Sequence, residues 1–184
     1  QDAFFQKAAK DFSIAILAIY SLLAIAFKSY LKPLGVLSAV PFGIMGAIFG
    51  HFIVGIDFSL LSFLGVFAAS GVVVNDNLVL VERVSELRRG GLSLKHALQK
   101  AGQDRFRPIM LTSITTFVGL APILFETSLQ AQFLIPMVTS LAFGVLFASP
   151  ITLLFVPCIY LLGAHGKNQW LAIISTRESS LGSS

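Results

Sequence analysis

The chain has 184 residues, of which 55% are hydrophobic and only 12% are charged, and its formal net charge is +4. A soluble domain of this size needs a polar surface that so few charged residues cannot provide. The apolar residues gather in runs of about 20, the length with which an α-helix crosses about 30 Å of hydrocarbon. The composition therefore excludes a soluble domain and predicts an all-α, polytopic membrane protein.

Five spanning helices are expected, at about residues 12–27, 33–54, 59–84, 108–125 and 133–162. The fourth is predicted to begin at Pro108, because proline favours the first position of a helix. The fifth is longer than a bilayer requires, so it is expected to start outside the hydrocarbon or to bend near Pro150. Residues 1–163 form a transmembrane domain in this interpretation, and residues 164–184 form a polar cytoplasmic tail that is partly disordered.

The loops alternate in charge. Eleven of the thirteen basic residues fall on one side of the predicted membrane, and Asp57 and Glu126 occupy the two short loops of the other side. Because cytoplasmic loops are enriched in Lys and Arg, the basic side is predicted to be cytoplasmic. The chain then enters from outside and ends inside.

The longest cytoplasmic loop contains a further helical pattern. After a Gly-Gly break, Ser93 is a suitable N-cap, and the apolar residues Leu94, Ala97, Leu98 and Ala101 follow at helical spacing. A short amphipathic helix on the membrane surface is expected, either as a packed connector or with a role of its own.

The sequence also limits the chemistry that the chain performs. It starts with Gln1 and without a leader pattern, so we interpret it as part of a longer protein. The single cysteine, Cys158, excludes an internal disulfide. His51, His96 and His165 lie in three separate places at predicted helix ends or loops, so no metal cluster is suggested. No phosphate-binding loop or catalytic triad is recognisable, so neither an enzyme nor a cofactor is expected.

An acidic residue lies inside the third predicted helix, in the run GVVVNDNLVLVERV. At about 100° per residue, Gly65, Ala69 and Asp76 fall nearly on one line, with Ser62 close by. Small residues on a transmembrane helix mark a face that another helix approaches, so Asp76 is expected to point into a helix bundle, toward a partner helix that this chain does not include. Such a residue serves an ion or proton path, with Asn75 and Asn77 beside it, or is a passive buried group with one partner.

The entrance to the fourth helix, RFRPIMLTSITTF, provides a second set of polar residues. Arg105 and Thr112 are seven residues apart, so they share a helix face. The other hydroxyls of this run are expected to bond back to their own backbone. Small residues at helical spacing in the second and fifth helices predict close packing, namely Gly43, Gly46, Gly50, Ser140, Gly144, Ala148 and Thr152.

Several motifs resemble those of the resistance–nodulation–division (RND) transporters, above all the acriflavine-resistance type of multidrug efflux pump. They are PFGIMG, GVVVNDNLVLVE, RFRPIMLTS, GLAP and the late Val-Pro pair at positions 156 and 157. The resemblance extends to about Leu162. It implies that the five helices are helices eight to twelve of a twelve-helix membrane domain.

The resemblance further implies a proton-driven exporter of hydrophobic compounds in the bacterial inner membrane. The implied partners are the lipid bilayer, the N-terminal half of the same transporter, two further copies in a homotrimer, a periplasmic adaptor and an outer-membrane channel. Nucleic acid is not among them. Arg105 and Thr112 match residues of the proton-relay region of the family.

One position departs from the pattern of the family. Asn75 falls where many multidrug members have a lysine, and Asp76 follows it. The usual charge partner of the aspartates in the first half is therefore missing, so the relay is rearranged or the coupling ion differs. Two alternatives stay open, a non-transporting scaffold or pump remnant and a protein-export subunit of the same superfamily.

Overall fold

The computed structural model describes the backbone of residues 2–181 and the side chains of residues 6–7, 9–30 and 32–161. Within this range all regular structure is helical, in the order α1 (Asp2–Phe27), α2 (Leu31–Leu37), α3 (Val40–Val54), α4 (Leu60–Arg89), α5 (Leu94–Leu124) and α6 (Leu129–Leu181). The expected polar tail, residues 164–184, lies outside the residues whose side chains are described.

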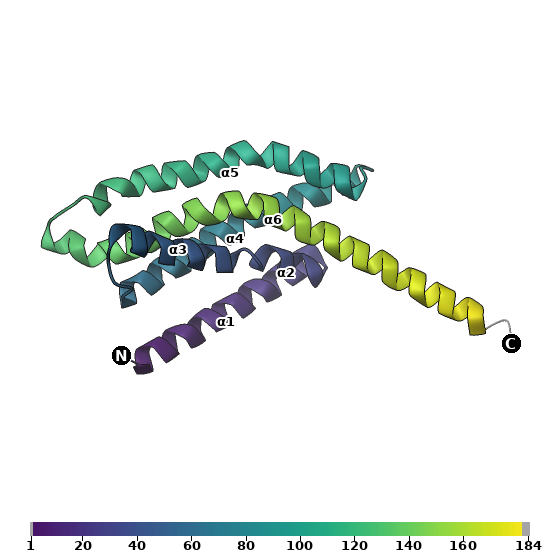
Figure 1. Ribbon diagram of the computed structural model, residues 1–184, viewed down its shortest axis with the longest axis horizontal. Helices are drawn as coiled ribbons and strands as arrows, with labels where there is room; N and C mark the ends of the chain where they lie inside the picture. Colours follow the sequence, from purple (N-terminus) through teal and green to yellow (C-terminus); the bar gives the residue numbers. More distant parts are fainter. Residues whose placement is uncertain (1, 182–184) are drawn as a thin grey trace.

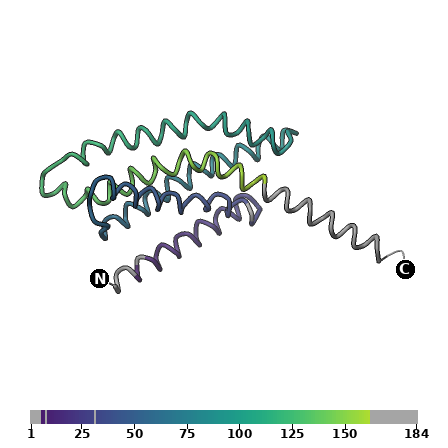
Figure 2. The backbone as a smooth tube through the Cα atoms, in the orientation of Figure 1, coloured from purple at the N-terminus to yellow at the C-terminus, as the bar shows by residue number. Residues whose placement is uncertain are grey.

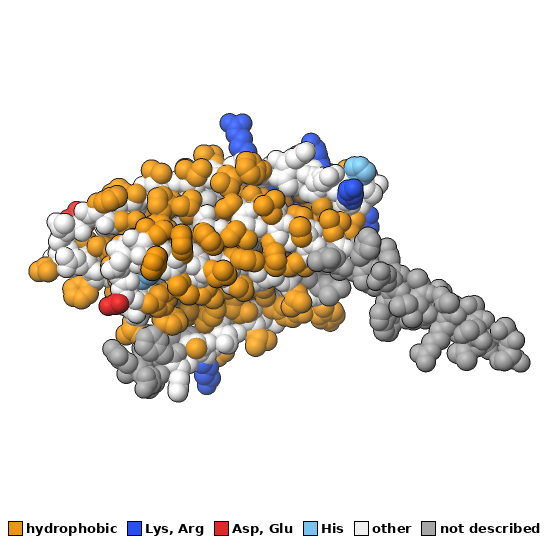
Figure 3. All heavy atoms as spheres, in the orientation of Figure 1, with side chains coloured by type: hydrophobic (Ala, Val, Ile, Leu, Met, Phe, Trp, Pro, Cys, Tyr) orange, Lys and Arg blue, Asp and Glu red, His pale blue; other side chains and the backbone are white. Residues whose placement is uncertain are grey.

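Five stretches of the described helices are long and apolar enough to span a membrane: Ala9–Phe27, Lys32–Val54, Leu60–Arg89, Leu94–Leu124 and Leu129–Leu161. The predicted all-α membrane fold is thereby confirmed. The hydrophobic side chains cover the face visible in Figure 3, and the charged side chains lie around its edges. Such an apolar exterior suits a surface that lipid covers.

α6 is the central helix of the bundle. It packs against α3, α4 and α5, and Figures 1 and 2 show α5 on one side of it and α3 on the other. α1 lies at the edge of the bundle, where it contacts α2 and α4. α4 and α6 therefore form the interior of the bundle, and their facing residues decide what is buried there.

The second predicted span is divided into α2 and α3. Ser38 and Ala39 separate the two helices, and Pro41 follows within the first turn of α3. Because proline has no backbone N–H, Pro41 cannot donate to the carbonyl of Leu37, and the regular hydrogen-bond ladder is interrupted there.

The fourth span does not begin at Pro108, so that prediction was wrong. α5 starts at Leu94 and continues through Pro108 as one helix that includes the predicted amphipathic segment. Ser93 does cap it, since its side chain accepts a hydrogen bond from the backbone N–H of His96. The apolar side of the segment packs against the end of α4, where Ala97, Leu98 and Ala101 join one hydrophobic cluster with Val81 and Val84. This packing stabilises the part of the helix that precedes the proline.

A charged contact ties the same two helices together. The guanidinium of Arg83 on α4 donates to the carboxylate of Asp104 on α5, with Nη2 and Oδ2 2.8 Å apart. Lys100 approaches the other carboxylate oxygen at 3.3 Å. The basic connector, the segment from Arg83 to Arg107 that joins the third and fourth predicted spans, is therefore held together by contacts between α4 and α5.

A buried histidine joins the C-terminal end of α3 to the N-terminal end of α4. Nε2 of His51 lies 2.7 Å from Oγ of Ser62, and Nδ1 lies 2.9 Å from the carbonyl oxygen of Ala47. Ser62 also accepts from the backbone N–H of Ser59, as part of a capping box that begins α4. Both side chains are buried, so His51 satisfies its polar atoms inside the protein.

Ser62→Ala is expected to lower the free energy of unfolding by about 2 kcal/mol, because it leaves a buried imidazole nitrogen without a partner and removes half of the cap. Equilibrium unfolding in mixed detergent micelles measures the change. Ser70→Ala is the matched control, because among the described residues the buried Ser70 hydroxyl bonds only to the carbonyl of Val66 in its own helix. Equal losses for the two variants would contradict a structural role for the His51–Ser62 contact.

Candidate ion-coupling site

Asp76 lies in the middle of α4 and faces the interior of the bundle. Its exposed fraction is 8%, and its Oδ2 atom is buried without a hydrogen-bond partner. The carboxyl group lies beside the hydroxyl of Ser149 on α6. No cation among the described residues forms an ion pair with it. Burying an ionised acidic group at this depth, with one polar neighbour and one oxygen that lacks a hydrogen bond, costs free energy.

Close contact between α4 and α6 creates this environment. On the face of α4 that includes Asp76, a Cβ atom built on Gly65 would collide with the backbone carbonyl of Met137 on α6. A Cβ atom built on Gly144 of α6 would lie 2.9 Å from the Cβ of Ala69. Only small side chains allow the two backbones to approach this closely.

The same kind of contact joins α3 to α6. Cβ atoms built on Gly46 and Gly50 would lie 2.7 Å from the carbonyl oxygen of Phe143 and 2.5 Å from its Cβ, respectively. The small residues of the two interfaces thus hold α3 and α4 against the same stretch of α6.

The two asparagines beside Asp76 differ in environment. Asn77 is buried at 1% exposure, and its side-chain nitrogen donates to the carbonyl oxygen of Val73, 2.9 Å away in the same helix. Asn75 is exposed, on a strip of α4 with Ala68 and Gly71, which are exposed as well. Asp76 is therefore the member of the triplet that faces α6 with unused hydrogen-bonding capacity.

Arg105 and Thr112 are not brought to Asp76. Thr112 is exposed, and its hydroxyl donates to the carbonyl oxygen of Pro108, 2.9 Å away. Arg105 is half-buried, and its Nε atom is buried without a hydrogen-bond partner. No hydrogen bond or ion pair between described residues links either side chain to Asp76.

The partner of Asp76 differs from the one that the sequence suggests. The polar patch is expected to face a helix from outside this chain, whereas the structure places Ser149 of α6 against the carboxyl group. Ser149 lies one residue away from the ridge of small residues predicted along α6, so that pattern does not include it.

The arrangement suits proton exchange more than catalysis. Asp76 can take up and release a proton, whereas Asn77 and Ser149 remain neutral and can only orient it. No nucleophile paired with a base lies beside it in the described part of the chain. Among the described residues, the geometry defines a membrane helix bundle with a buried carboxyl group on α4, and an ionisable side chain at that depth is a candidate for an ion or proton path.

Comparison with known proteins identifies the family. The sequence profile described as "AcrB/AcrD/AcrF family" matches residues 5–164. The chain belongs to this family, which is part of the RND transporters, and the resemblance seen in its motifs is thereby confirmed.

The chain is similar to family members that are named for different roles. It is 35% identical over 147 residues to the swarming motility protein SwrC of Bacillus subtilis, which covers 79% of the chain and 14% of that protein. It is 29% identical over 171 residues to the multidrug resistance protein MdtC of Proteus mirabilis, covering 90% and 17%. It is 31% identical over 156 residues to the cobalt-zinc-cadmium resistance protein CzcA of Cupriavidus metallidurans, covering 85% and 15%. The chain thus spans less than a fifth of the length of these relatives.

Proposed function

We propose that this chain is the second transmembrane half, helices eight to twelve, of a proton-driven efflux transporter of the bacterial inner membrane. The proposal rests on Asp76, an ionisable side chain in the centre of an RND helix bundle with one oxygen that no hydrogen bond satisfies. Protonation would remove the cost of burying its charge, and deprotonation would restore it. Such an exchange can couple proton passage to a change in helix packing. The exported compounds would be hydrophobic or drug-like.

The exposed strip of α4 supports the assignment as one half of a larger bundle. Ala68, Gly71 and Asn75 are small or polar, lie on one side of the helix and are uncovered. Small residues in a row favour the approach of a further helix, and the N-terminal half of the transporter would supply it. Asn75 then lies at the junction of the two halves. Because it is next to Asp76 in sequence, a change in the protonation of Asp76 can affect the contacts of Asn75.

The family assignment and the charge pattern give the proposed setting. The basic connector and the C-terminus lie in the cytoplasm, and the loops with Asp57 and Glu126 lie outside. Residues 1–163 form the membrane domain, followed by a tail of residues 164–184. The complete transporter assembles as a homotrimer with a periplasmic adaptor and an outer-membrane channel.

The proposal is tested with the full-length transporter in sealed lipid vesicles. A pH gradient, acid on the side of the Asp57 and Glu126 loops, is expected to drive a hydrophobic cationic dye toward the acid compartment. Entry of protons into the opposite compartment should accompany the movement of dye, and a protonophore should abolish both. Fluorescence of the dye and of an entrapped pH indicator measures the two fluxes.

A sodium gradient of equal size, applied in place of the pH gradient, distinguishes proton coupling from sodium coupling and from a protein that does not transport the dye. Transport driven by sodium without proton movement would reassign the coupling ion. Absence of dye movement under either gradient, with the protein correctly inserted, would favour a scaffold or a protein-export subunit.

A further inference from the structure

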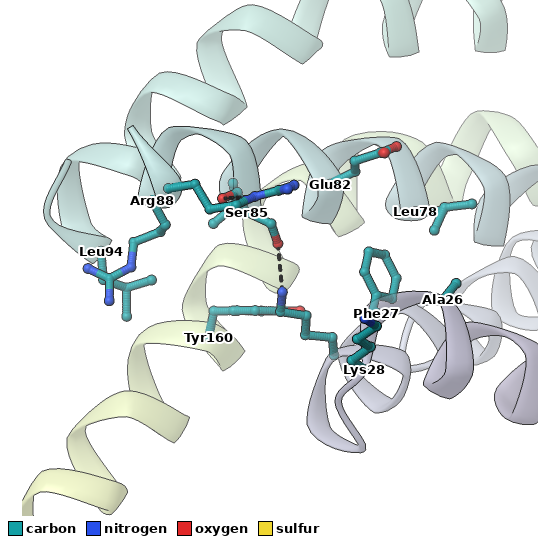
Figure 4. A pocket seen from close by; sticks show the side chains of 12 residues that line it. Ala26, Phe27, Lys28, Leu78, Glu82, Ser85, Arg88, Leu94 and Tyr160 are labelled. Atoms are coloured by element: carbon teal, nitrogen blue, oxygen red, sulfur yellow. Dashed lines mark hydrogen bonds between the residues drawn. The ribbon is translucent and has the colours of Figure 1, made fainter. Parts of the chain in front are cut away.

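A second feature of the bundle is an open cavity of about 850 Å³ at the end where the basic loops gather. It lies between the end of α1, the segment leading into α2, the last turns of α4 and Tyr160 of α6. Figure 4 shows Arg88 and Leu94 on one side of it and Ala26 and Phe27 on the other. The cavity is separate from Asp76, which does not line it.

Four of the residues that line this cavity are basic: Lys28, Lys32, Arg88 and Arg89. None of them takes part in an ion pair between described residues, because the ion pairs found there join Arg83 to Glu86 and Asp104, and Lys100 to Asp104. Glu82 is the acidic residue of the lining, and in Figure 4 its carboxylate points away from the hydrogen bond that Ser85 accepts. The cavity therefore has an uncompensated positive charge.

Hydrogen bonds hold three of these cations without neutralising them. Nζ of Lys32 donates to Oγ of Ser85 at 2.9 Å, the bond drawn in Figure 4. Nη1 of Arg88 donates to the carbonyl oxygen of Leu92 and Nε of Arg89 to that of Ser85, each at 3.4 Å. All three acceptors are neutral. A lysine held in this way keeps further N–H donors for a ligand.

The rest of the lining is apolar or aromatic. The ring of Phe27 lies 5.5 Å from Nζ of Lys32, and Leu78 lies deeper along α4. The hydroxyl of Tyr160 is buried without a hydrogen-bond partner, which leaves one more polar atom of the lining unused. Positive charge next to apolar surface, at helix ends that border the bilayer, suits a ligand with an anionic head and a hydrocarbon body.

We propose that this cavity binds an anionic phospholipid, with the phosphate held by Lys32 and Arg88 and the acyl chains against Phe27 and Leu78. The phosphate supplies the negative charge that the lining lacks, in charge-assisted hydrogen bonds. The bilayer supplies such lipids at this depth, whereas a free phosphate ion would leave the apolar lining uncovered. The bound lipid would join α1 and α2 to the end of α4.

Native mass spectrometry of the full-length transporter in detergent tests the proposal with phosphatidylglycerol as the probe. The variant Lys32→Gln/Arg88→Gln is expected to weaken phosphatidylglycerol binding about tenfold or more, since each basic residue near a lipid headgroup contributes on the order of a fivefold change in affinity. The control variant Lys95→Gln/Arg107→Gln removes the same charge from exposed residues of α5 outside the cavity. It should bind the lipid as the wild type does.

Further measurements distinguish the bound lipid from a free phosphate ion and from a folding defect. Phosphatidylcholine should bind more weakly and equally to all variants, and inorganic phosphate should not displace phosphatidylglycerol at equal concentration. Lys32→Arg/Arg88→Lys, which keeps both charges, should retain binding and shows that loss in the first variant is not a folding defect. Equal loss of binding in the two glutamine variants, or displacement by inorganic phosphate, would overturn the proposal.

Discussion

Replacement of Gly65 by alanine is expected to separate α4 from α6 and to lower the free energy of unfolding by about 3 kcal/mol. The added methyl group would meet the backbone carbonyl of Met137 and lie 2.7 Å from Cβ of Ser140. A backbone atom cannot move aside as the end of a flexible side chain can, so the helices themselves must shift. The change spreads to Asp76, which depends on the same contact for its burial.

Unfolding of the chain in mixed micelles, followed by loss of helical circular dichroism, measures this effect. Gly71→Ala is the matched control, because Gly71 lies on the same helix and a Cβ atom there meets nothing within 4 Å. Both substitutions raise helix propensity by the same amount, about 1 kcal/mol. A Gly65→Ala variant as stable as Gly71→Ala would show that α4 and α6 are not in close contact.

The helices could be predicted from the sequence because hydrocarbon requires long apolar runs, and such runs are visible in one dimension. The residues at which the helices begin and end were harder to predict. The sequence predicts a helix start at Pro108, yet α5 runs through it, since a proline removes one backbone hydrogen bond and packing of Leu98 against α4 compensates for this loss. Whether a proline begins or interrupts a helix depends on contacts with other helices.

The candidate site could be predicted only in part for a related reason. The burial of Asp76 follows from its alignment with Gly65 and Ala69, which is a property of one helix. The approach of Ser149 depends on the register between α4 and α6, and residues more than seventy positions apart in sequence give no local sign of that register. The same limit applies to Arg105 and Thr112. Their shared helix face does not predict which residues of the other helices lie near it.

Asp76→Asn in the full-length transporter is expected to reduce proton-driven dye transport about a hundredfold, the loss typical of removing a positioned proton-transfer group. Asparagine has nearly the same size as aspartate, so the packing of α4 against α6 should survive. What it cannot do is exchange a proton. Transport should therefore also lose its dependence on pH.

Asp57→Asn is the matched control, since it removes a carboxylate from the exposed loop between α3 and α4. It should transport dye as the wild type does at every pH, whereas Asp76→Glu should retain pH-dependent transport at a reduced rate, because a carboxyl group remains but is displaced. If Asp76→Asn instead transports normally across the pH range, the side chain is a packing group. The coupling ion must then act in the other half of the transporter, which would face the exposed strip of α4 that includes Asn75.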